Sequence, residues 1–305
     1  MNIVLGTDDN YVVPCIVCIT SIFENNKDLL CSVYILTECL SESNLEMFEK
    51  LSRKYDRKIK IININKGEFD KLAIKGRYSK AMYNRFLIPE VLREQDFALY
   101  LDCDIIVNGS LSYLCNIDMS CYACAVVKDQ MCQDTRLLNK RLDLDTPYFN
   151  SGVIYMNLSY WRKFDLSSKC IEFIYNNSNQ DLLLFPDQDA LNKVLSGKVL
   201  YLPLTYNFQE RFYLITNNRF VDNEMLEEIK EYAGSPIIIH FTDRIKPWFE
   251  ECSHPLKELF FKYYSINFGN IELSKYYTLA RRLKIIKSNY IRFVSFIKRG
   301  MRRKF

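Results

Sequence analysis

Two aspartates separated by one residue form the most chemically suggestive part of the sequence. Asp102-Cys103-Asp104 stands between the apolar residues 98–101 and the β-branched residues 105–107, a pattern typical of a buried strand. Because side chains alternate along a strand, Asp102 and Asp104 project to one side and Cys103 to the other. Close carboxylates repel each other unless a cation compensates, and oxygen ligands favour Mg²⁺, Ca²⁺ or Mn²⁺. The pattern indicates a metal site, with a merely polar strand end as the alternative.

Further polar side chains come just after other expected strands. Asp8 and Asn10 follow the apolar residues 2–6 and precede a helix expected over residues 12–23. They have the chemistry to hydrogen-bond a base and a ribose, or simply to cap that helix. Asp129 likewise follows a strand expected over residues 122–127. These side chains are candidates for a binding site at the strand ends.

The order of the apolar patterns predicts an α/β domain. Strands are expected over residues 2–6, 32–36 and 58–64, alternating with helices over residues 12–23 and 43–55. A helix over residues 79–92 carries Arg85 and leads into the strand with the two aspartates. This alternation favours a largely parallel sheet with helices on both faces, whose ligands bind beyond the carboxyl ends of the strands.

Charge is distributed unevenly along the 305 residues. The net charge is +4, but residues 275–305 contain eleven Lys or Arg and no Asp or Glu, so the rest of the chain carries a net charge of −7. In this tail, cations mix with apolar and aromatic residues at helical spacing, which favours contact with an anionic membrane surface. A merely solvated end is the next reading, and nucleic-acid binding is the least favoured.

The cysteines and the apolar runs bear on the compartment. Eleven cysteines is an odd number, and they are scattered through apolar runs, which argues for free thiols in a reducing compartment. The sequence shows neither a positively charged start leading into a long apolar run nor an apolar stretch of membrane-spanning length. We therefore expect a cytoplasmic protein.

His254 is expected at the surface, as is usual for a histidine.

Five motifs occur in the order seen in one enzyme family. They are Asp8-Asp9-Asn10-Tyr11, Leu99-Tyr100-Leu101-Asp102-Cys103-Asp104, Tyr148-Phe149-Asn150-Ser151-Gly152-Val153, Asp187-Gln188-Asp189, and His240 followed by Lys246-Pro247-Trp248. In this order they resemble glycosyltransferase family 8, and within it the bacterial lipopolysaccharide galactosyl- and glucosyltransferases. The resemblance covers residues 1–250.

The resemblance implies a fold and a reaction. It implies the GT-A nucleotide-diphospho-sugar transferase fold over residues 1–250, with a mixed, mostly parallel sheet between helices. Residues 251–305 would be a helical extension that ends in the basic, membrane-associating tail. The expected reaction moves galactose or glucose from a UDP-sugar, with retention, to a saccharide or lipid-linked saccharide of lipopolysaccharide or another cell-surface glycan. Mn²⁺ is the implied metal, with Mg²⁺ as the alternative, and the expected location is the inner face of the cytoplasmic membrane.

The same resemblance assigns roles to residues. The metal ligands would be Asp102, Asp104 and His240. The nucleotide part of the donor would be contacted by Asp8, Asn10, Cys103 and Lys246, with Lys246 at the diphosphate. The donor sugar would be surrounded by Arg85, Asp129, Asn150, Asp187 and Gln188, the last four being the catalytic candidates.

Gln188 bears on the mechanism, and Asp243 bears on the function. A neutral Gln188 is a poor nucleophile, so a front-face displacement is at least as plausible as a covalent intermediate. Relatives commonly have Gly three residues after the metal-binding histidine, where this chain has Asp243, and weaker diphosphate binding would suit a silent nucleotide-sugar-binding module. A nucleotidyltransferase is disfavoured because no Gly-rich phosphate loop follows the first strand.

The acceptor is expected at residues 130–147 and 205–235.

Overall fold

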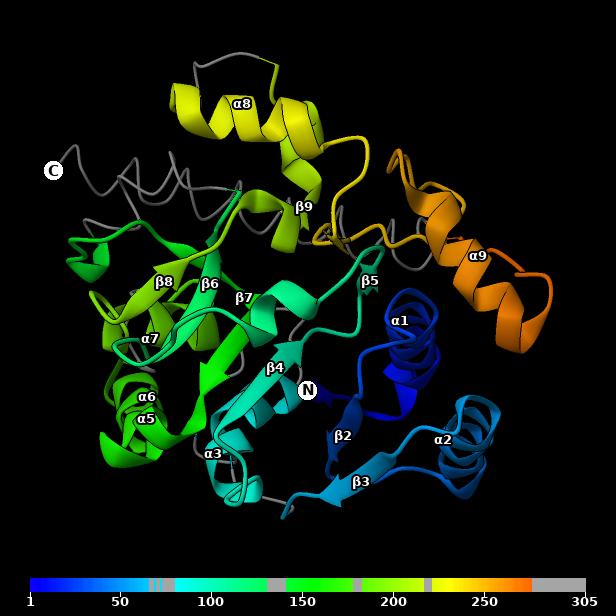
Figure 1. Cartoon of the computed structure of the whole chain (residues 1–305), viewed down its shortest axis with the longest axis horizontal. Helices are drawn as coiled ribbons and strands as arrows, with labels where there is room; N and C mark the ends of the chain where they lie inside the picture. Colours follow the sequence, from blue (N-terminus) through cyan, green and yellow to red (C-terminus); the bar gives the residue numbers. More distant parts are fainter. Residues whose placement is uncertain are drawn as a thin grey trace, which may run out of the picture. The chain divides into compact units, whose positions relative to one another are not determined.

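The structure is a computed structural model that describes residues 1–65, 69, 72, 80–130, 141–177, 183–216 and 221–275. The chain divides into two compact units, Met1–Thr242 and Asp243–Phe305 (Figure 1). The first unit contains both β-sheets, and the described part of the second contains helix α9 (Lys257–Phe268). Residues 276–305 of the predicted basic tail lie outside the described residues.

The larger sheet has seven strands in the order β3-β2-β1-β4-β7-β6-β8. The strands are β1 (Asn2–Gly6), β2 (Ser32–Thr37), β3 (Ile59–Asn63), β4 (Phe97–Leu101), β6 (Cys124–Lys128), β7 (Phe149–Asn157) and β8 (Val199–Tyr201). Strand β7 is antiparallel to both of its neighbours, β4 and β6, and the other neighbouring pairs are parallel. The predicted mixed, mostly parallel sheet is confirmed.

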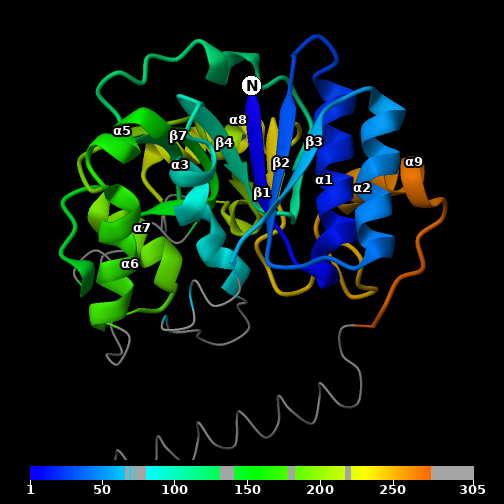
Figure 2. The same cartoon turned by 90° about the horizontal axis from the view of Figure 1, so that it is seen from below.

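Helices cover both faces of this sheet (Figures 1 and 2). One face carries α1 (Val12–Asn25) and α2 (Glu42–Tyr55), and the other carries α3 (Ile88–Val91), α5 (Leu158–Lys163), α6 (Leu166–Asn177) and α7 (Pro186–Val194). Alternate strand residues such as Val4, Tyr100 and Ile154 point into the second layer, where they join one buried cluster with side chains of α5, α6 and α7. The strands are apolar on both faces because both faces are covered.

A second, three-stranded sheet explains how the two aspartates are presented. It consists of β5 (Ile105–Val107), β10 (Ile238–His240) and β9 (Phe208–Gln209), with β10 in the middle. We expected one strand over residues 98–107, but the chain leaves the large sheet after Leu101 and enters the small one at Ile105. Strand β10 runs antiparallel to β5, with His240 opposite Ile105, so His240 lies next to the Asp102–Asp104 turn.

Two local predictions were wrong. Residues 80–91 form a 3₁₀ helix, η2 (Lys80–Leu87), followed by the short α3, instead of one α-helix over residues 79–92. Pro89 explains the break because it has no amide proton for a helical hydrogen bond, so it is tolerated in the first turn of a helix but not in the interior of one. His254, expected at the surface, is only 2% exposed, and its Nδ1 accepts a hydrogen bond from the Leu256 amide at 3.1 Å. Burial lowers the pKa of His254 to about 4.

The remaining described elements connect these layers. They are η1 (Asp9–Tyr11), η3 (Ser112–Cys115), η4 (Leu204–Tyr206), η5 (Glu210–Leu214) and α8 (Asn223–Tyr232).

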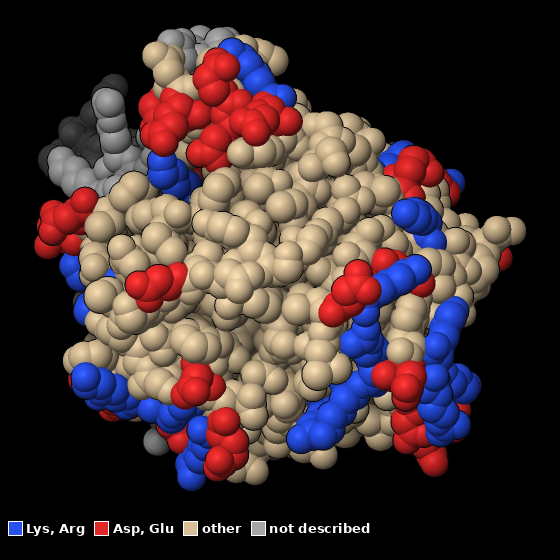
Figure 3. All heavy atoms as spheres, in the orientation of Figure 1, with Lys and Arg blue, Asp and Glu red and all other residues tan. Residues whose placement is uncertain are grey.

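Figure 3 shows a wide surface of uncharged side chains over the region where β4, β6 and β7 lie in Figure 1. Within the described ranges, no helix combines the length and apolar character needed to cross a membrane.

Candidate functional site

The predicted site residues of the first unit converge at one edge of the large sheet. Strands β1 and β4 are parallel, with Leu5 opposite Leu101, so the residues that follow each strand emerge side by side. Strand β7 begins at this edge, and Asp129 follows β6 there, its amide donating to the Tyr148 carbonyl at 3.0 Å. Segments far apart in sequence therefore bring their polar side chains to one place.

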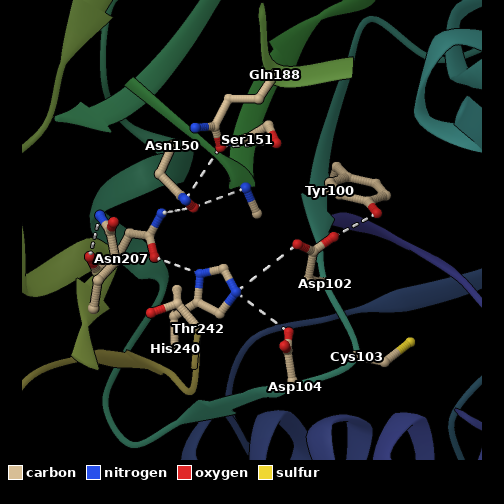
Figure 4. A network of polar contacts seen from close by, with 12 residues as sticks. Tyr100, Asp102, Cys103, Asp104, Asn150, Ser151, Gln188, Asn207, His240 and Thr242 are labelled. Carbon is tan, nitrogen blue, oxygen red and sulfur yellow. Dashed lines mark hydrogen bonds and ion pairs between the residues drawn. The ribbon is translucent and has the colours of Figure 1, made fainter. Parts of the chain in front are cut away.

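Two aspartates and a histidine form the centre of this edge (Figure 4). One ligand atom from each of Asp102, Asp104 and His240 can be chosen so that all three lie within 4.8 Å of one another. His240 Nε2 is 3.2 Å from Asp104 Oδ1 and 3.8 Å from Asp102 Oδ2. Two carboxylates and an imidazole nitrogen form a donor set suited to a divalent cation such as Mn²⁺. The predicted trio is thus brought together by the fold.

The thiol between the two aspartates faces the other way. Cys103 Sγ donates to the Gly6 carbonyl oxygen at 3.3 Å, and Figure 4 shows the side chain directed away from both carboxylates. The three side chains divide as predicted, although Cys103 and Asp104 form a turn and not part of a strand. Only the main chain of Cys103 is left for the predicted nucleotide contact.

Arg85 and Tyr100 hold Asp102 in place. Arg85 Nη2 donates to Asp102 Oδ1 at 2.9 Å and to the Tyr100 hydroxyl at 3.0 Å, and that hydroxyl donates to Asp102 Oδ1 at 2.7 Å. Burial by itself would lower the pKa of Arg85, but the surrounding oxygens, including the Asp102 and Asp187 carboxylates, outweigh it and raise the pKa. Oδ2 of Asp102 remains directed toward His240.

His240 is held on its other nitrogen by a residue that the sequence did not point to. Nδ1 of His240 lies 3.0 Å from Asn207 Oδ1, and Asn207 Nδ2 donates to Asn150 Oδ1 at 2.9 Å. Asn207 follows η4 in a segment where no motif stands out, and it comes close to His240 because β9 pairs with β10. Only this long-range strand pairing identifies it.

Gly152 allows the close approach of His240. A Cβ atom built on Gly152 would lie 2.1 Å from His240 Cε1 and 2.8 Å from Asp102 Oδ2. Both distances are below the range of real Cβ contacts. The glycine of the Asn150-Ser151-Gly152 motif therefore leaves the space that the histidine ring occupies.

The candidates expected around the donor sugar form a second cluster beside the first. Asp129 Oδ2 accepts from Asn150 Nδ2 at 3.1 Å and from Gln188 Nε2 at 3.2 Å. Gln188 Oε1 lies 2.9 Å from the Ser151 amide, 3.2 Å from the Ser151 hydroxyl and 3.2 Å from Asn150 Nδ2. Because a backbone amide can only donate, the Ser151 contact fixes which end of the Gln188 amide is the oxygen.

Asp187 is linked to the metal side through Arg85. Its Oδ2 lies 3.1 Å from Arg85 Nη1 and 3.4 Å from the Ser151 hydroxyl. Burial raises the pKa of Asp187, and the Arg85 guanidinium opposes that rise. Asp187 and Gln188 stand in the first turn of α7, which begins at Pro186, a residue well suited to the first position of a helix.

The residues expected to contact the nucleotide belong to both units of the chain. Asp8 caps η1, accepting from the Asn10 amide at 3.0 Å, and the Asn10 side chain is exposed. Asp8 therefore caps the 3₁₀ turn before α1 and not α1 itself, whose N-cap Tyr11 makes no side-chain cap. Asp8 and Asn10 remain at the edge that carries Asp102. Lys246, which is buried, and the exposed Asp243 belong to the second unit.

Comparison with known proteins identifies the family of the chain. A model of the family described as Glycosyl transferase family 8 matches residues 2–252. The chain belongs to glycosyl transferase family 8. The protein is therefore a glycosyltransferase, and the Asp102–Asp104–His240 cluster is its candidate divalent-metal site.

Individual glycosyltransferases resemble the chain over most of its length. A lipopolysaccharide 1,2-glucosyltransferase of Escherichia coli (strain K12) is 30% identical over 273 residues, covering 88% of this chain and 78% of that protein. A lipopolysaccharide 1,3-galactosyltransferase of Salmonella typhimurium is 26% identical over 268 residues, covering 85% of this chain and 76% of that protein. The crystal structure of the galactosyltransferase LgtC with donor and acceptor sugar analogs superposes with a TM-score of 0.78 at 26% identity, covering 88% of this chain and 96% of that one. The GT-A fold is confirmed.

Proposed function

We propose that the protein transfers a hexose, galactose or glucose, from a UDP-sugar to a saccharide or lipid-linked saccharide acceptor with retention of configuration. The observation that carries the proposal is the metal-type cluster of Asp102, Asp104 and His240 directly beside the Asp129–Asn150–Gln188 cluster. A diphosphate leaving group needs a cation, and a sugar losing that group needs polar oxygens around its ring. The two clusters supply these two requirements side by side.

The relatives support the choice of sugar and acceptor. Two of them are lipopolysaccharide glucosyl- and galactosyltransferases, and the LgtC structure contains donor and acceptor sugar analogs. We therefore propose lipopolysaccharide or a related cell-surface glycan as the acceptor. The catalytic domain in this proposal comprises residues 1–250, with the acceptor bound by residues 130–147 and 205–235.

Each nucleotide-contacting group has a part in the proposed reaction. Asp102, Asp104 and His240 would hold Mn²⁺, or Mg²⁺ as the alternative, which neutralises the charge that develops on the departing diphosphate. Lys246 would add a second positive charge at the diphosphate. The uridine would rest against Asp8, Asn10 and the main chain of Cys103. These assignments follow the order of the motifs and remain part of the proposal.

The hydrogen bonds of Gln188 favour a front-face displacement. Its carbonyl oxygen faces two N–H donors and the Ser151 hydroxyl, so its lone pairs are already engaged and it is a poor nucleophile. Asp187, the other candidate nucleophile, is paired with Arg85. In the proposed mechanism both side chains stabilise the developing positive charge on the sugar, and the leaving-group oxygen assists the acceptor hydroxyl. A glycosyl adduct trapped on either side chain would refute this mechanism.

The first experiment measures UDP release from a panel of UDP-sugars without acceptor, with Mn²⁺ and then with EDTA. Slow, EDTA-sensitive hydrolysis of one UDP-hexose is the expected result, and it names the donor. The matched variant is Asp104→Asn, which removes one ligand charge at constant size. Absence of both hydrolysis and calorimetric binding of UDP with Mn²⁺ would contradict the proposal.

A silent nucleotide-sugar-binding module is the second candidate. The observation that favours it is Asp243, an exposed carboxylate where relatives commonly have Gly. Binding of UDP without hydrolysis, even with acceptor glycans present, would support this alternative. Recovery of activity in Asp243→Gly would show that the carboxylate is responsible.

We also propose that the protein is cytoplasmic and peripherally attached to the inner face of the cytoplasmic membrane through its basic tail. The support is the charge of residues 275–305, with eleven cations and no acid. The full-length protein should sediment with anionic vesicles, and a truncation before Lys275 should not. Equal sedimentation of both forms would rule out the tail as the attachment.

A further inference from the structure

We propose that Asn207 is a positioning residue that fixes the tautomer of His240. It does so through a chain of side-chain amides that also includes Asn150. The inference rests on the proposed metal-dependent function, because it concerns which nitrogen of His240 is available to a cation. Asn207 belongs to none of the five motifs, and its role follows from the hydrogen bonds in Figure 4.

The amide chain has a defined direction because both ends of Asn150 are fixed. Asn150 Oδ1 accepts from the Gly152 backbone amide at 3.0 Å, and a backbone amide can only donate. At its other end, Asn150 Nδ2 donates to Asp129 Oδ2 at 3.1 Å and to Gln188 Oε1 at 3.2 Å, an oxygen that the Ser151 backbone amide identifies. Neither the Gly152 contact nor the Gln188 contact survives a flip of the Asn150 amide, so its oxygen must face Asn207.

The direction of Asn150 then determines that of Asn207. The atom of Asn207 that lies 2.9 Å from Asn150 Oδ1 must be the amide nitrogen, because two oxygens would repel each other. The oxygen of Asn207 therefore lies on the opposite side, 3.0 Å from His240 Nδ1. An oxygen acceptor at this distance requires a proton on Nδ1.

The position of Asn207 is itself held firmly. The side chain is 0% exposed, so water does not compete for its hydrogen bonds. The backbone amide of Asn207 donates to the Leu204 carbonyl at 3.0 Å, and the backbone carbonyl of Asn207 accepts from Gln209 Nε2 at 3.3 Å. Gln209 is also fully buried and extends from β9 to the Lys128 carbonyl at the end of β6.

A proton on Nδ1 leaves the lone pair of His240 on Nε2, which is the nitrogen near Asp102 and Asp104. A lone pair and two carboxylates then point into the same small volume, an arrangement that attracts a cation. Outer partners of a metal-binding histidine set its tautomer and orientation, and losing one typically weakens metal binding by about 10- to 100-fold. Asn207 is placed to have this effect.

The second histidine of the chain provides an internal contrast. His254 Nδ1 accepts from the Leu256 amide at 3.1 Å, so its proton must be on Nε2. The protein has only two histidines, and the structure assigns opposite tautomers to them. Nitrogen NMR distinguishes a protonated from an unprotonated ring nitrogen directly.

The experiment uses metal-free, full-length protein labelled with ¹⁵N-histidine, in buffer at pH about 9, above the ordinary histidine pKa of about 6.5. The expected spectrum shows one Nδ1–H and one Nε2–H imidazole, and His254→Gln removes only the Nε2–H set. A His240 resonance pattern of the Nε2–H type would overturn the proposal. This measurement does not depend on catalysis, so it stands or fails separately from the proposed function.

Variants then test whether Asn207 is the cause. Asn207→Leu should convert part of the His240 population to the other tautomer and weaken Mn²⁺ binding, measured calorimetrically, by about 10- to 100-fold. Asn207→Asp keeps an acceptor at Nδ1 and should keep the Nδ1–H tautomer, while its second oxygen loses the hydrogen bond to Asn150 Oδ1. Asn26→Leu is the matched control: it removes a buried amide that bonds to the Ile22 and Gly109 carbonyls and to the Leu111 amide. It should lower stability and leave Mn²⁺ affinity unchanged.

The outcomes separate the possible failures. An unchanged His240 tautomer in Asn207→Leu would refute the role of Asn207 even if the enzyme remains active. Should that variant not fold, the tautomer of the wild-type protein still decides the inference. Absence of Mn²⁺ binding in a wild-type protein with the expected tautomer would refute the proposed function and leave the assignment of the tautomer intact.

Discussion

Replacing Gly152 with alanine adds one methyl group at the point where the metal-type cluster has least space. The new Cβ would lie 2.1 Å from His240 Cε1, whereas ordinary Cβ contacts begin at 3.4 Å. If the backbone stays in place, the imidazole ring has to recede by about 1.3 Å. The same methyl group would lie 2.8 Å from Asp102 Oδ2, so a second ligand is disturbed as well.

The backbone of Gly152 has little freedom to avoid this clash. Its amide donates to Asn150 Oδ1 at 3.0 Å, and its carbonyl accepts from the Asp102 amide at 2.9 Å. Moving the backbone would break the amide chain at one end or shift Asp102 at the other. A misplacement of about 1 Å at a reacting centre can cost roughly 10²-fold in rate, and we expect a loss of that size in Gly152→Ala.

The assay compares Mn²⁺ affinity and UDP-sugar turnover in Gly152→Ala with those in Gly234→Ala. A Cβ on Gly234 meets no atom within 4 Å, so this variant adds the same methyl group without a clash. We expect both properties to fall in Gly152→Ala and to stay unchanged in Gly234→Ala, with native-like far-UV circular dichroism in each. Wild-type Mn²⁺ affinity in a folded Gly152→Ala protein would refute the reasoning.

Three further predictions concern the metal, Arg85 and His254. EDTA should abolish turnover and Mn²⁺ should restore it, and full activity in EDTA would exclude a metal role for Asp102 and Asp104. Arg85→Gln should raise the KM for the donor and lower kcat, since Arg85 contacts Asp102 and Asp187; unchanged kinetics would contradict this positioning. His254, with a pKa of about 4, contributes stability above pH 6.5 that is lost as the pH falls toward 4. That loss is about 3 kcal/mol, and it should be absent from urea unfolding of His254→Gln; identical pH profiles would refute it.

Short-range patterns in the sequence predicted the central features of the site. Strand alternation placed Asp102 and Asp104 on one side and Cys103 on the other, and the structure shows this arrangement. The apolar residues just before His240 are also a local strand pattern, and β10 ends at this histidine. The division of the three side chains at residues 102–104 holds even though Cys103 and Asp104 form a turn between two strands.

Features that depend on contacts between distant segments could not be predicted. Asn207 becomes important only because β9 pairs with β10, and no local pattern marks it. His254 stands among polar neighbours in the sequence, yet tertiary packing buries it. The passage of the chain from the large sheet to the small one at Asp102–Asp104 was also missed, since continuous apolar runs on both sides look like one strand.

The arrangement of charges explains how one site can serve both halves of the proposed reaction. Asp102 and Asp104 face His240, where a divalent cation would offset their charge. Asp187 is paired with Arg85, which also contacts Asp102 and thereby connects the two halves. Asp129 accepts from the side-chain amides of Asn150 and Gln188, which orient its carboxylate. This carboxylate is thus oriented on the side proposed for the sugar, where positive charge develops as the bond to the diphosphate breaks.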